Sequence, residues 1–307
     1  GSRLPTMQQN VLKLTVVVPC YNEESRLPTQ AFIDYLASGA HEVQLLFVDD
    51  GSTDQTVQLL QRIAAAAPAK RAAVLSLGNN QGKAEAVRRG MLQAIEAGDC
   101  DIVGFWDSDL ATPLAAIADL AAELRARPAM QMVFGARVAL LGRDIRRSAK
   151  RHYLGRVFAT LASLVLELPI YDTQCGAKLF RATPHLTSTL STPFLTRWVF
   201  DVEMIARFAA LAHSSGAREG PGSSIVEYPL HHWMDVAGSK LKPFDILKMA
   251  YGLLLIRNTY FLREWPGGGW REDKVTEALA LVGAVVMLVV LMLCILGMLI
   301  HAAIQCH

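Results

Sequence analysis

Residues 102–109 read Ile102-Val103-Gly104-Phe105-Trp106-Asp107-Ser108-Asp109, an apolar run that ends in two carboxylates. A run of β-branched and aromatic residues of this length is typical of a buried strand in a parallel sheet. The pattern occurs twice upstream, in Leu45-Leu46-Phe47-Val48-Asp49-Asp50-Gly51-Ser52 and in Leu14-Thr15-Val16-Val17-Val18-Pro19 with the polar Cys20-Tyr21-Asn22-Glu23 after it. Because open α/β sheets bind ligands beyond the carboxyl ends of their strands, we expect these three strand ends to line one crevice.

Segments with helical spacing separate these strands. Helices are expected over 24–38, 55–67 and 82–97, with a short strand over 73–77 before the last of them. Beyond residue 109, Pro113 begins another helix, and a further strand follows it. Strands that alternate with helices in this way indicate an α/β fold with a Rossmann-like, mostly parallel sheet flanked by helices.

The composition narrows the classes of protein to which the chain can belong. At 307 residues it is long enough to bury a full α/β core. A formal net charge of +2 excludes a strongly basic nucleic-acid binder. The five cysteines lack metal-ligand spacing, and their odd number argues against a disulfide framework. Hydrophobic residues make up 52%, and the excess lies toward the C-terminal end, which indicates a membrane anchor.

An uncharged apolar segment extends from Ala278 to Ile300. A helix of this length, at about 1.5 Å per residue, spans a hydrocarbon core of about 30 Å, and buried helices of soluble domains rarely stay uncharged for so long. Arg271 and Lys274 precede the segment, and no Lys or Arg follows it. By the positive-inside rule we expect a single-pass membrane protein whose N-terminal part is cytosolic, at the bacterial inner membrane or, in a eukaryote, the endoplasmic reticulum. No N-terminal leader marks the chain for secretion.

Two other apolar stretches, 153–168 and 245–262, suit amphipathic helices that lie at the membrane interface. Core helices would show the same pattern. Trp265 and Trp270 favour the interfacial interpretation, because tryptophan is enriched at the headgroup boundary. The lipid membrane is therefore an expected partner, and self-association through the C-terminal span is left open.

The tripeptide Asp107-Ser108-Asp109 has the D-x-D spacing, which lets carboxylates at one strand end face a divalent cation and the phosphates bound to it. Mg²⁺ and Mn²⁺ prefer such oxygen ligands. Asp-rich turns are common, so the tripeptide alone is a weak signal. It gains weight here because it follows an apolar strand and because Gly82-Lys83 and the Asp49-Asp50-Gly51-Ser52 turn precede it.

With these motifs in this order, residues 14–265 resemble the inverting family-2 nucleotide-sugar glycosyltransferases of the GT-A fold. Within that family the chain is most similar to the polyprenyl-phosphate hexose synthases of the dolichyl-phosphate β-glucosyltransferase type. The resemblance rests on four strings: Asp107-Ser108-Asp109-Leu110-Ala111-Thr112, Asp172-Thr173-Gln174-Cys175-Gly176-Ala177-Lys178-Leu179-Phe180, Phe200-Asp201-Val202-Glu203 and Trp233-Met234-Asp235-Val236-Ala237-Gly238-Ser239-Lys240-Leu241.

The resemblance implies an enzyme that transfers a hexose from a nucleotide sugar to a polyprenyl phosphate at the cytosolic membrane face, with inversion at the anomeric carbon. The related mannose synthases usually carry an Arg where this chain has Trp233 and Met234, which favours glucose from UDP-glucose. Two alternatives stay open. One is a polyprenyl-phosphate mannose synthase that uses GDP-mannose, and the other is a non-catalytic, membrane-anchored binding protein.

The resemblance also assigns roles at the donor site. Asp107 and Asp109 would hold Mg²⁺ or Mn²⁺ and the donor diphosphate, so that the metal neutralises charge on the departing nucleoside diphosphate. For the turn at Asp49-Asp50-Gly51-Ser52, helix capping is the competing explanation. The expected nucleotide-sugar-binding residues are Pro19, Tyr21, Glu23, Asp50, Lys83, Asp107 and Ser108.

The chemistry of a phosphate acceptor determines whether the enzyme must supply a catalytic base. With a second pKa of about 6, a phosphomonoester is mostly a dianionic nucleophile at neutral pH, and it needs no strong base. Asp201 joins Asp107 and Asp109 as a catalytic candidate, but Asp201 and Glu203 are expected to be structural or acceptor-positioning groups unless the acceptor is a hydroxyl. Cys175 is expected to be a packing residue rather than a nucleophile.

Cationic side chains are expected to guide the acceptor phosphate, because two anionic substrates must approach each other. A basic face that touches anionic lipids is the competing explanation. The candidates for acceptor and phosphate binding are Arg137, Arg147, Arg151 and Lys240.

Four regions are expected along the chain. Residues 1–12 would be an N-terminal extension whose first two residues are a cloning remnant. Residues 13–235 would form the GT-A catalytic domain, 236–274 a juxtamembrane amphipathic segment and 275–304 the transmembrane helix.

Overall fold

A computed structural model describes residues 12–38, 43–68, 71–214, 221–236 and 243–262, together with Gly283. Its centre is a sheet with the strand order β3-β2-β1-β4-β7-β5-β8. The strands are β1 (Leu14–Cys20), β2 (Val43–Asp49), β3 (Ala72–Ser76), β4 (Ile102–Trp106), β5 (Met132–Ala136), β7 (Ala177–Arg181) and β8 (Ile225–Pro229).

The strand pairing brings the predicted strand ends together. Strand β1 pairs in parallel with β2, where Cys20 lies opposite Asp49, and with β4, where Val17 lies opposite Phe105. Strand β7 is antiparallel to both β4 and β5, so the sheet is mostly but not wholly parallel. The predicted α/β architecture and the convergence of the ends of β1, β2 and β4 at one edge are therefore confirmed.

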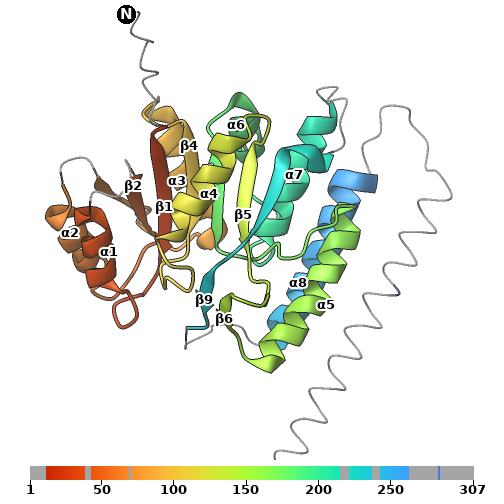
Figure 1. Cartoon of the computed structure of the whole chain (residues 1–307), viewed down its shortest axis with the longest axis horizontal. Helices are drawn as coiled ribbons and strands as arrows, with labels where there is room; N and C mark the ends of the chain where they lie inside the picture. The colour runs from red at the N-terminus through yellow and green to blue at the C-terminus, as the bar shows by residue number, and fades with distance from the viewer. Residues whose placement is uncertain are drawn as a thin grey trace, which may run out of the picture.

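Helices cover both faces of the sheet (Figure 1). Consecutive residues of β1 face opposite sides, so Val17 packs in the core beneath one helical layer while Val16 and Val18 pack beneath the other. One layer holds α1 (Thr29–Ala37), α2 (Thr56–Ala66) and α4 (Ala116–Ala126), and the other holds α3 (Lys83–Glu96), α5 (Ala149–Leu166), α6 (Pro184–Leu190), α7 (Phe200–Ser214) and α8 (Pro243–Arg257). The short helices η1 (Pro221–Ser224) and η2 (Asn258–Leu262) complete the described elements.

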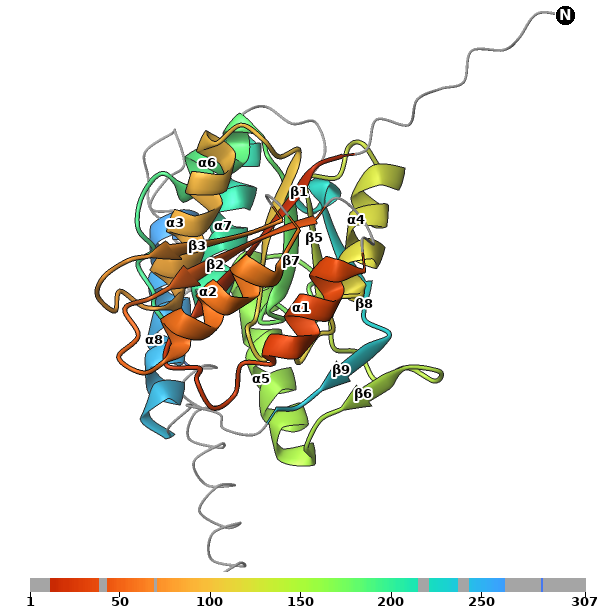
Figure 2. The ribbon, with the colours of Figure 1, turned by 90° about the vertical axis from the view of Figure 1, so that its left-hand side faces the viewer.

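A second, two-stranded sheet pairs β6 (Asp144–Arg146) with β9 (His232–Met234) in parallel. Figure 2 shows the two strands side by side, apart from the main sheet. The backbone N–H of Met234 donates a hydrogen bond of 3.0 Å to the carbonyl of Ala111, just after the D-x-D tripeptide. The small sheet is thereby fastened to the turn that carries the acidic motif.

Helices α5 and α8 lie side by side in Figure 1 and correspond to the two stretches expected at the membrane interface. Each contributes buried residues to the core, such as Val165 from α5 and Leu253 from α8. Other residues of the pair point to solvent, among them Tyr153 and Leu164. One face of the pair is thus core, and membrane contact by the other face stays a prediction.

The single-pass membrane placement needs correction. In the part of the chain that the structure describes, no helix is long and apolar enough to cross a membrane. The expected span, 275–304, lies outside the described residues except for Gly283, as does much of the expected segment 236–274. The division of the chain into four regions stays a prediction.

Candidate active site

The loops after β1 and β2 are tied to each other. Asn22 adopts a left-handed conformation with φ of 50°, and its Oδ1 accepts a hydrogen bond of 2.9 Å from the backbone N–H of Thr53. The backbone N–H of Glu23 donates to Thr56 Oγ1 at 2.8 Å, and its carboxylate binds Arg26 with Oε1 2.6 Å from Nη2. These contacts fix the entrance of the site, beside which the ring of Tyr21 is 36% exposed.

Asp50 anchors the loop that leads into α3. Its Oδ1 accepts a hydrogen bond of 2.7 Å from the backbone N–H of Gln81, and its Oδ2 accepts one of 2.8 Å from that of Gly82. Burial raises the pKa of Asp50, while these two bonds and the charge of Arg197 oppose that rise. The carboxylate therefore organises the backbone just before α3. Neither α2 nor α3 has a side-chain hydrogen bond at its N-cap, so helix capping by this turn is not found, and the nucleotide role of Asp50 stays a prediction.

The D-x-D tripeptide forms a tight turn at the end of β4. Asp109 Oδ1 accepts a hydrogen bond of 3.1 Å from the backbone N–H of Ala111. Between them Leu110 has a φ of 52°, a left-handed conformation that is rare for leucine. Residues held in such conformations cluster at functional sites, where the surroundings stabilise them.

Asp107 is held from two sides. Lys83 at the start of α3 places its Nζ 2.5 Å from Asp107 Oδ1. On the other side lies Gly176, where an added Cβ would be only 2.0 Å from Asp107 Oδ2. Burial lowers the pKa of Lys83, but the charges of Asp107 and Asp201 outweigh it and hold the pKa above its usual value. Lys83 therefore stays protonated beside the carboxylates.

The two carboxylates of the motif suit a hard divalent cation. Burial and the neighbouring charge of Asp107 raise the pKa of Asp109, which means that the pair repel each other when both are ionised. A bound cation would relieve that repulsion. Among the described residues, no group of three or more His, Cys, Asp or Glu side chains is placed to hold a metal. Asp107 and Asp109 would therefore need oxygen ligands from a bound substrate to complete a coordination shell.

Asp201, at the start of α7, faces a buried lysine. Lys178 is fully buried, and its Nζ lies 3.1 Å from Asp201 Oδ1 and donates a hydrogen bond of 2.5 Å to the carbonyl of Cys175. The rings of Phe105 and Phe134 flank the ammonium group at 5.5 and 5.4 Å. Asp201 is thus neutralised by an ion pair.

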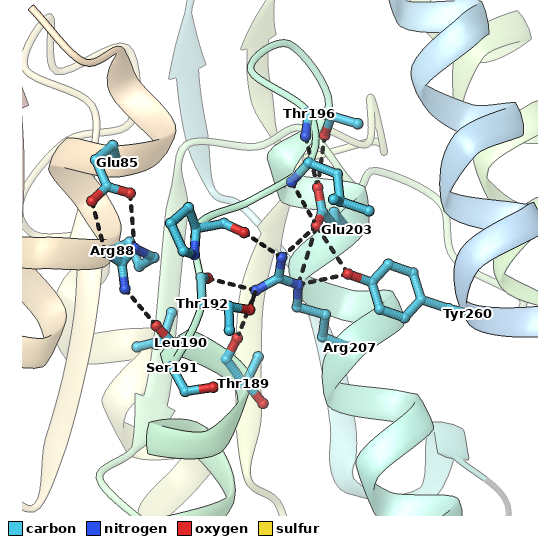
Figure 3. A network of polar contacts seen from close by, with 12 residues as sticks. Glu85, Arg88, Thr189, Leu190, Ser191, Thr192, Thr196, Glu203, Arg207 and Tyr260 are labelled. Atoms are coloured by element: carbon cyan, nitrogen blue, oxygen red, sulfur yellow. Dashed lines mark hydrogen bonds and ion pairs between the residues drawn. The ribbon is translucent and has the colours of Figure 1, made fainter. Parts of the chain in front are cut away.

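Glu203, two residues further along α7, is fully buried. It accepts hydrogen bonds of 2.9 Å from the backbone N–H groups of both Leu195 and Thr196, and it pairs with Arg207 at 2.7 Å (Figure 3). Every one of these partners is a protein group. These contacts support a structural role for the Glu203 carboxylate, and whether it also positions the acceptor stays a prediction.

The predicted phosphate-binding arginines form one cluster, but their partners differ. Arg137 makes two bonds to the Asp172 carboxylate, at 2.6 and 2.7 Å, and stacks over the ring of Trp233. Arg151 forms an ion pair with Asp235. Burial raises the pKa of Asp172, but Arg137 outweighs burial and lowers it. Two of these cations are therefore already paired with carboxylates.

Arg147 differs from its neighbours. Its guanidinium lies against Gly155 of α5, where an added Cβ would be 2.4 Å from Nη2. Its buried Nε has no hydrogen-bond partner within the described residues. Burial and the charge of Arg137 lower the pKa of Arg147, and Asp172 and Asp235 only partly compensate. Among the described residues, Arg147 is thus the cation of this cluster for which no carboxylate partner is found.

The remaining predicted residues are placed as follows. Pro19 is in β1, and Ser108 is buried within the D-x-D turn. Lys240 lies outside the described residues. Cys175 is fully buried in the core, and burial raises its pKa to about 11, so it is a packing residue as expected.

A pocket of about 320 Å³ adjoins the D-x-D turn and the small β6–β9 sheet. Its wall is mostly apolar, with charged groups at the edge. It is lined by Leu110, Ala111, Pro113, Asp144, Arg146, His232, Trp233 and Met234.

Two residues at the site were not expected from the sequence. Lys178 stands inside the apolar string Ala177-Lys178-Leu179-Phe180, and a lone lysine in a buried strand is the signal that could have found it. Arg197 precedes the string Phe200-Asp201-Val202-Glu203, and its Nε would lie 2.9 Å from a Cβ added at Gly82. Proximity to that string is the only signal that the sequence offers.

Comparison with known proteins gives concordant results. A model of the family described as "Glycosyl transferase family 2" matches residues 15–186. A dolichyl-phosphate beta-glucosyltransferase of Drosophila melanogaster is 33% identical over 83% of this chain and 77% of its own length. The proteins of that name from Homo sapiens and Saccharomyces cerevisiae are 32% and 30% identical, over 89% and 85% of this chain and 82% and 77% of their own lengths.

Solved structures resemble the fold as well. Glucosyl-3-phosphoglycerate synthase of Mycobacterium tuberculosis, in complex with Mn²⁺, UDP-glucose and phosphoglyceric acid, matches with a TM-score of 0.57. The sequences are 22% identical, and the match covers 80% of each chain. The similarity shows that most of this chain has the same GT-A-like fold.

Proposed function

The chain belongs to glycosyl transferase family 2, and we propose that this enzyme transfers glucose from UDP-glucose to a polyprenyl phosphate, with inversion at the anomeric carbon. Relatives named dolichyl-phosphate beta-glucosyltransferase, at about 30% identity over most of the chain, support glucose as the transferred sugar and a polyprenyl phosphate as the acceptor. The observation that carries the proposal is the position of the arginine cluster beside the D-x-D turn: Arg137 lies 5.3 Å from the ring centroid of Trp233 in β9, and the next residue of β9, Met234, is hydrogen-bonded at 3.0 Å to Ala111, just after that turn.

The donor occupies the crevice beyond β1, β2 and β4 in this proposal. Tyr21 is exposed for stacking on the nucleobase, and Pro19, Glu23 and Asp50 form the surrounding wall. Lys83 and Ser108 lie where the donor phosphates would reach the D-x-D turn.

Asp107 and Asp109 would hold Mg²⁺ or Mn²⁺. When bound there, the metal would neutralise charge on the departing nucleoside diphosphate, which is electrostatic rather than acid–base catalysis. Lys83 adds a positive charge at the same place, because its ammonium group contacts Asp107 and stays protonated.

The acceptor is a phosphate in this proposal because the chain offers a cation to bind it. Arg147 has the only guanidinium in the cluster of Arg137, Arg147 and Arg151 for which no carboxylate contact is found among the described residues. A phosphate oxygen attacks the anomeric carbon as the bond from that carbon to UDP breaks. A dianionic phosphate needs no base, in agreement with the Asp201–Lys178 ion pair.

The polyprenyl chain of the acceptor would extend toward α5. Arg147 lies against Gly155 of that helix, and Tyr153 and Leu164 expose apolar side chains on the opposite face of the same helix. This surface is proposed to contact the isoprenoid chain or the bilayer that holds it.

A donor panel tests the proposal. The purified enzyme is incubated with Mg²⁺ or Mn²⁺, a short polyprenyl phosphate and, separately, UDP-glucose, UDP-galactose, UDP-N-acetylglucosamine or GDP-mannose. We expect lipid-linked glucose from UDP-glucose. Turnover of GDP-mannose alone would identify a mannose synthase instead, and the absence of product with every donor would contradict the proposed activity.

A further inference from the structure

The segment before α7 is pinned by the helix that follows it. Glu203 Oε2 accepts hydrogen bonds from both the backbone N–H and the Oγ1 of Thr196, at 2.9 and 3.1 Å. The N–H of Leu195 donates to Oε1 at 2.9 Å. One buried carboxylate therefore fixes the backbone of the two residues that directly precede Arg197.

Arg207 fixes the other end of the segment (Figure 3). Its Nη1 donates to the carbonyl of Thr192 at 2.7 Å, and its Nη2 donates to the carbonyl of Pro193 at the same distance. The same guanidinium pairs with Glu203 at 2.7 Å. Residues 192–196, here called the pinned segment, are thus held by an ion pair within α7.

Tyr260 connects this ion pair to η2. Its hydroxyl donates to Glu203 Oε1 at 3.1 Å and accepts from Arg207 Nε at 2.9 Å. Tyr260 is partly buried, and burial followed by the charge of Glu203 raises its pKa to about 12, so it stays a donor at neutral pH. The hydroxyl therefore contacts both members of the pair that holds the pinned segment.

Arg197 follows the pinned segment and extends over the donor loop. Its guanidinium lies against Gly82, and its Nη2 is 3.4 Å from Asn80 Oδ1. Gly82 has a φ of 95° and donates its backbone N–H to Asp50, while its neighbour Lys83 pairs with Asp107. Arg197 is exposed, and its positive charge acts on Asp50, the carboxylate that binds the backbone N–H of Gly82.

We propose that Arg197 is a further donor-binding residue, and that Glu203 and Tyr260 are positioning residues that hold it above Gly82. The ligand chemistry is that of a nucleoside diphosphate, whose anionic oxygens pair with a guanidinium. The inference rests on the proposed function for the identity of the donor. The described C-terminal elements α7 and η2 would then control the affinity for the donor, because they hold the pinned segment and thereby the position of Arg197.

The test is a double-mutant cycle on nucleotide affinity. UDP binding is measured by calorimetry for the wild type, Tyr260→Phe, Arg197→Gln and the double variant, and KM values are measured for donor and acceptor. Tyr251→Phe is the matched control, because Tyr251 is 69% exposed on α8. Melting temperatures are recorded for every variant.

We expect Arg197→Gln to weaken UDP binding about tenfold, the size typical of one charge-assisted hydrogen bond. Tyr260→Phe should weaken it about threefold, a smaller loss because Tyr260 acts on UDP only through the position of Arg197. The acceptor KM stays unchanged in both. The double variant binds UDP no more weakly than Arg197→Gln alone, because Tyr260 acts through Arg197. Tyr251→Phe binds UDP like the wild type.

Additive losses in the double variant would overturn the inference. So would a lower melting temperature of Tyr260→Phe with normal UDP affinity, because the network would then be structural only. A wild type that binds UDP but makes no lipid-linked glucose would refute the proposed function and leave this coupling measurable. A wild type that binds GDP more tightly than UDP would refute UDP-glucose as the donor, and the same cycle measured with GDP would then support or overturn the coupling by the same criteria. A wild type that binds neither nucleotide would overturn both proposals.

Discussion

Gly176 and Asp107 approach so closely that a methyl group at position 176 would overlap the Asp107 carboxylate. The distance from an added Cβ to Asp107 Oδ2 is 2.0 Å, and Asp107 also donates its backbone N–H to the carbonyl of Gly176 at 2.9 Å. The antiparallel strand β7 therefore begins against the acidic motif, and the glycine before it leaves space for the carboxylate that would bind metal.

Gly176→Ala is expected to displace Asp107 and lower kcat about 100-fold or more, because misplaced electrostatic groups lose most of their effect on the transition state. The measurement is kcat together with the metal concentration for half-maximal rate, which should rise. Gly222→Ala is the matched control, since the nearest atom to its Cβ is a Leu168 methyl group at 3.4 Å. Equal activities of the two variants would contradict the role of this contact.

Asp109→Asn should abolish turnover and yet stabilise the metal-free protein at neutral pH. Burial and Asp107 raise the pKa of Asp109, so the folded state binds protons more tightly there than the unfolded state. Its contribution to the unfolding free energy is thus most favourable at low pH and falls as pH rises through the raised pKa. Melting temperatures with EDTA should therefore increase in the variant at pH 7 and less at pH 4. A lower melting temperature at pH 7 would contradict this account.

Arg147→Gln should raise the KM for polyprenyl phosphate about tenfold or more, through loss of a charge-assisted contact, and leave the donor KM unchanged. Its stability should change little, because no described carboxylate pairs with it. Arg137→Gln should instead unfold more easily, by about 3–5 kcal/mol, since it leaves the buried Asp172 carboxylate without its guanidinium partner. Arg127→Gln, exposed at the end of α4, serves as the control. Equal acceptor KM values for Arg147→Gln and the control would remove Arg147 from the acceptor site.

Lys178→Met should lower the unfolding free energy by about 3–5 kcal/mol, because Asp201 is then buried as an uncompensated charge. Adding Asp201→Asn should recover part of that loss in urea titrations. Asp201→Asn alone should reduce kcat less than about tenfold, whereas removal of a general base costs about 100-fold or more. A loss of the larger size would make Asp201 the base and point to a hydroxyl acceptor.

The strands were predictable because burial on both faces produces long apolar runs. The runs that end at Pro19, Val48 and Trp106 became β1, β2 and β4 in parallel register. The first helix was predicted from residue 24, but α1 begins at Thr29, because residues 23–27 form a turn with bonds from Arg26 and Leu27 to the carbonyl of Glu23. Local turn chemistry there outweighs helical periodicity.

The site was predictable where one strand end carries the chemistry, as at Asp107 and Asp109. The role of a residue was not predictable where that role depends on a partner that is distant in sequence. Arg137 and Arg147 look alike in sequence, and only the fold places Asp172 beside the first. Lys178 and Arg197 were missed for the same reason, because their partners, Asp201 and Gly82, are distant in sequence.

The most direct test of the central claim compares two acceptors that differ only in the phosphate. UDP-glucose and Mg²⁺ or Mn²⁺ are supplied with either a short polyprenyl phosphate or the corresponding polyprenol, and lipid-linked glucose is quantified by mass spectrometry. We predict glucosylation of the phosphate alone, with a β-linkage by NMR. Glucosylation of the polyprenol, or an α-linked product, would contradict an inverting transfer to a phosphate acceptor.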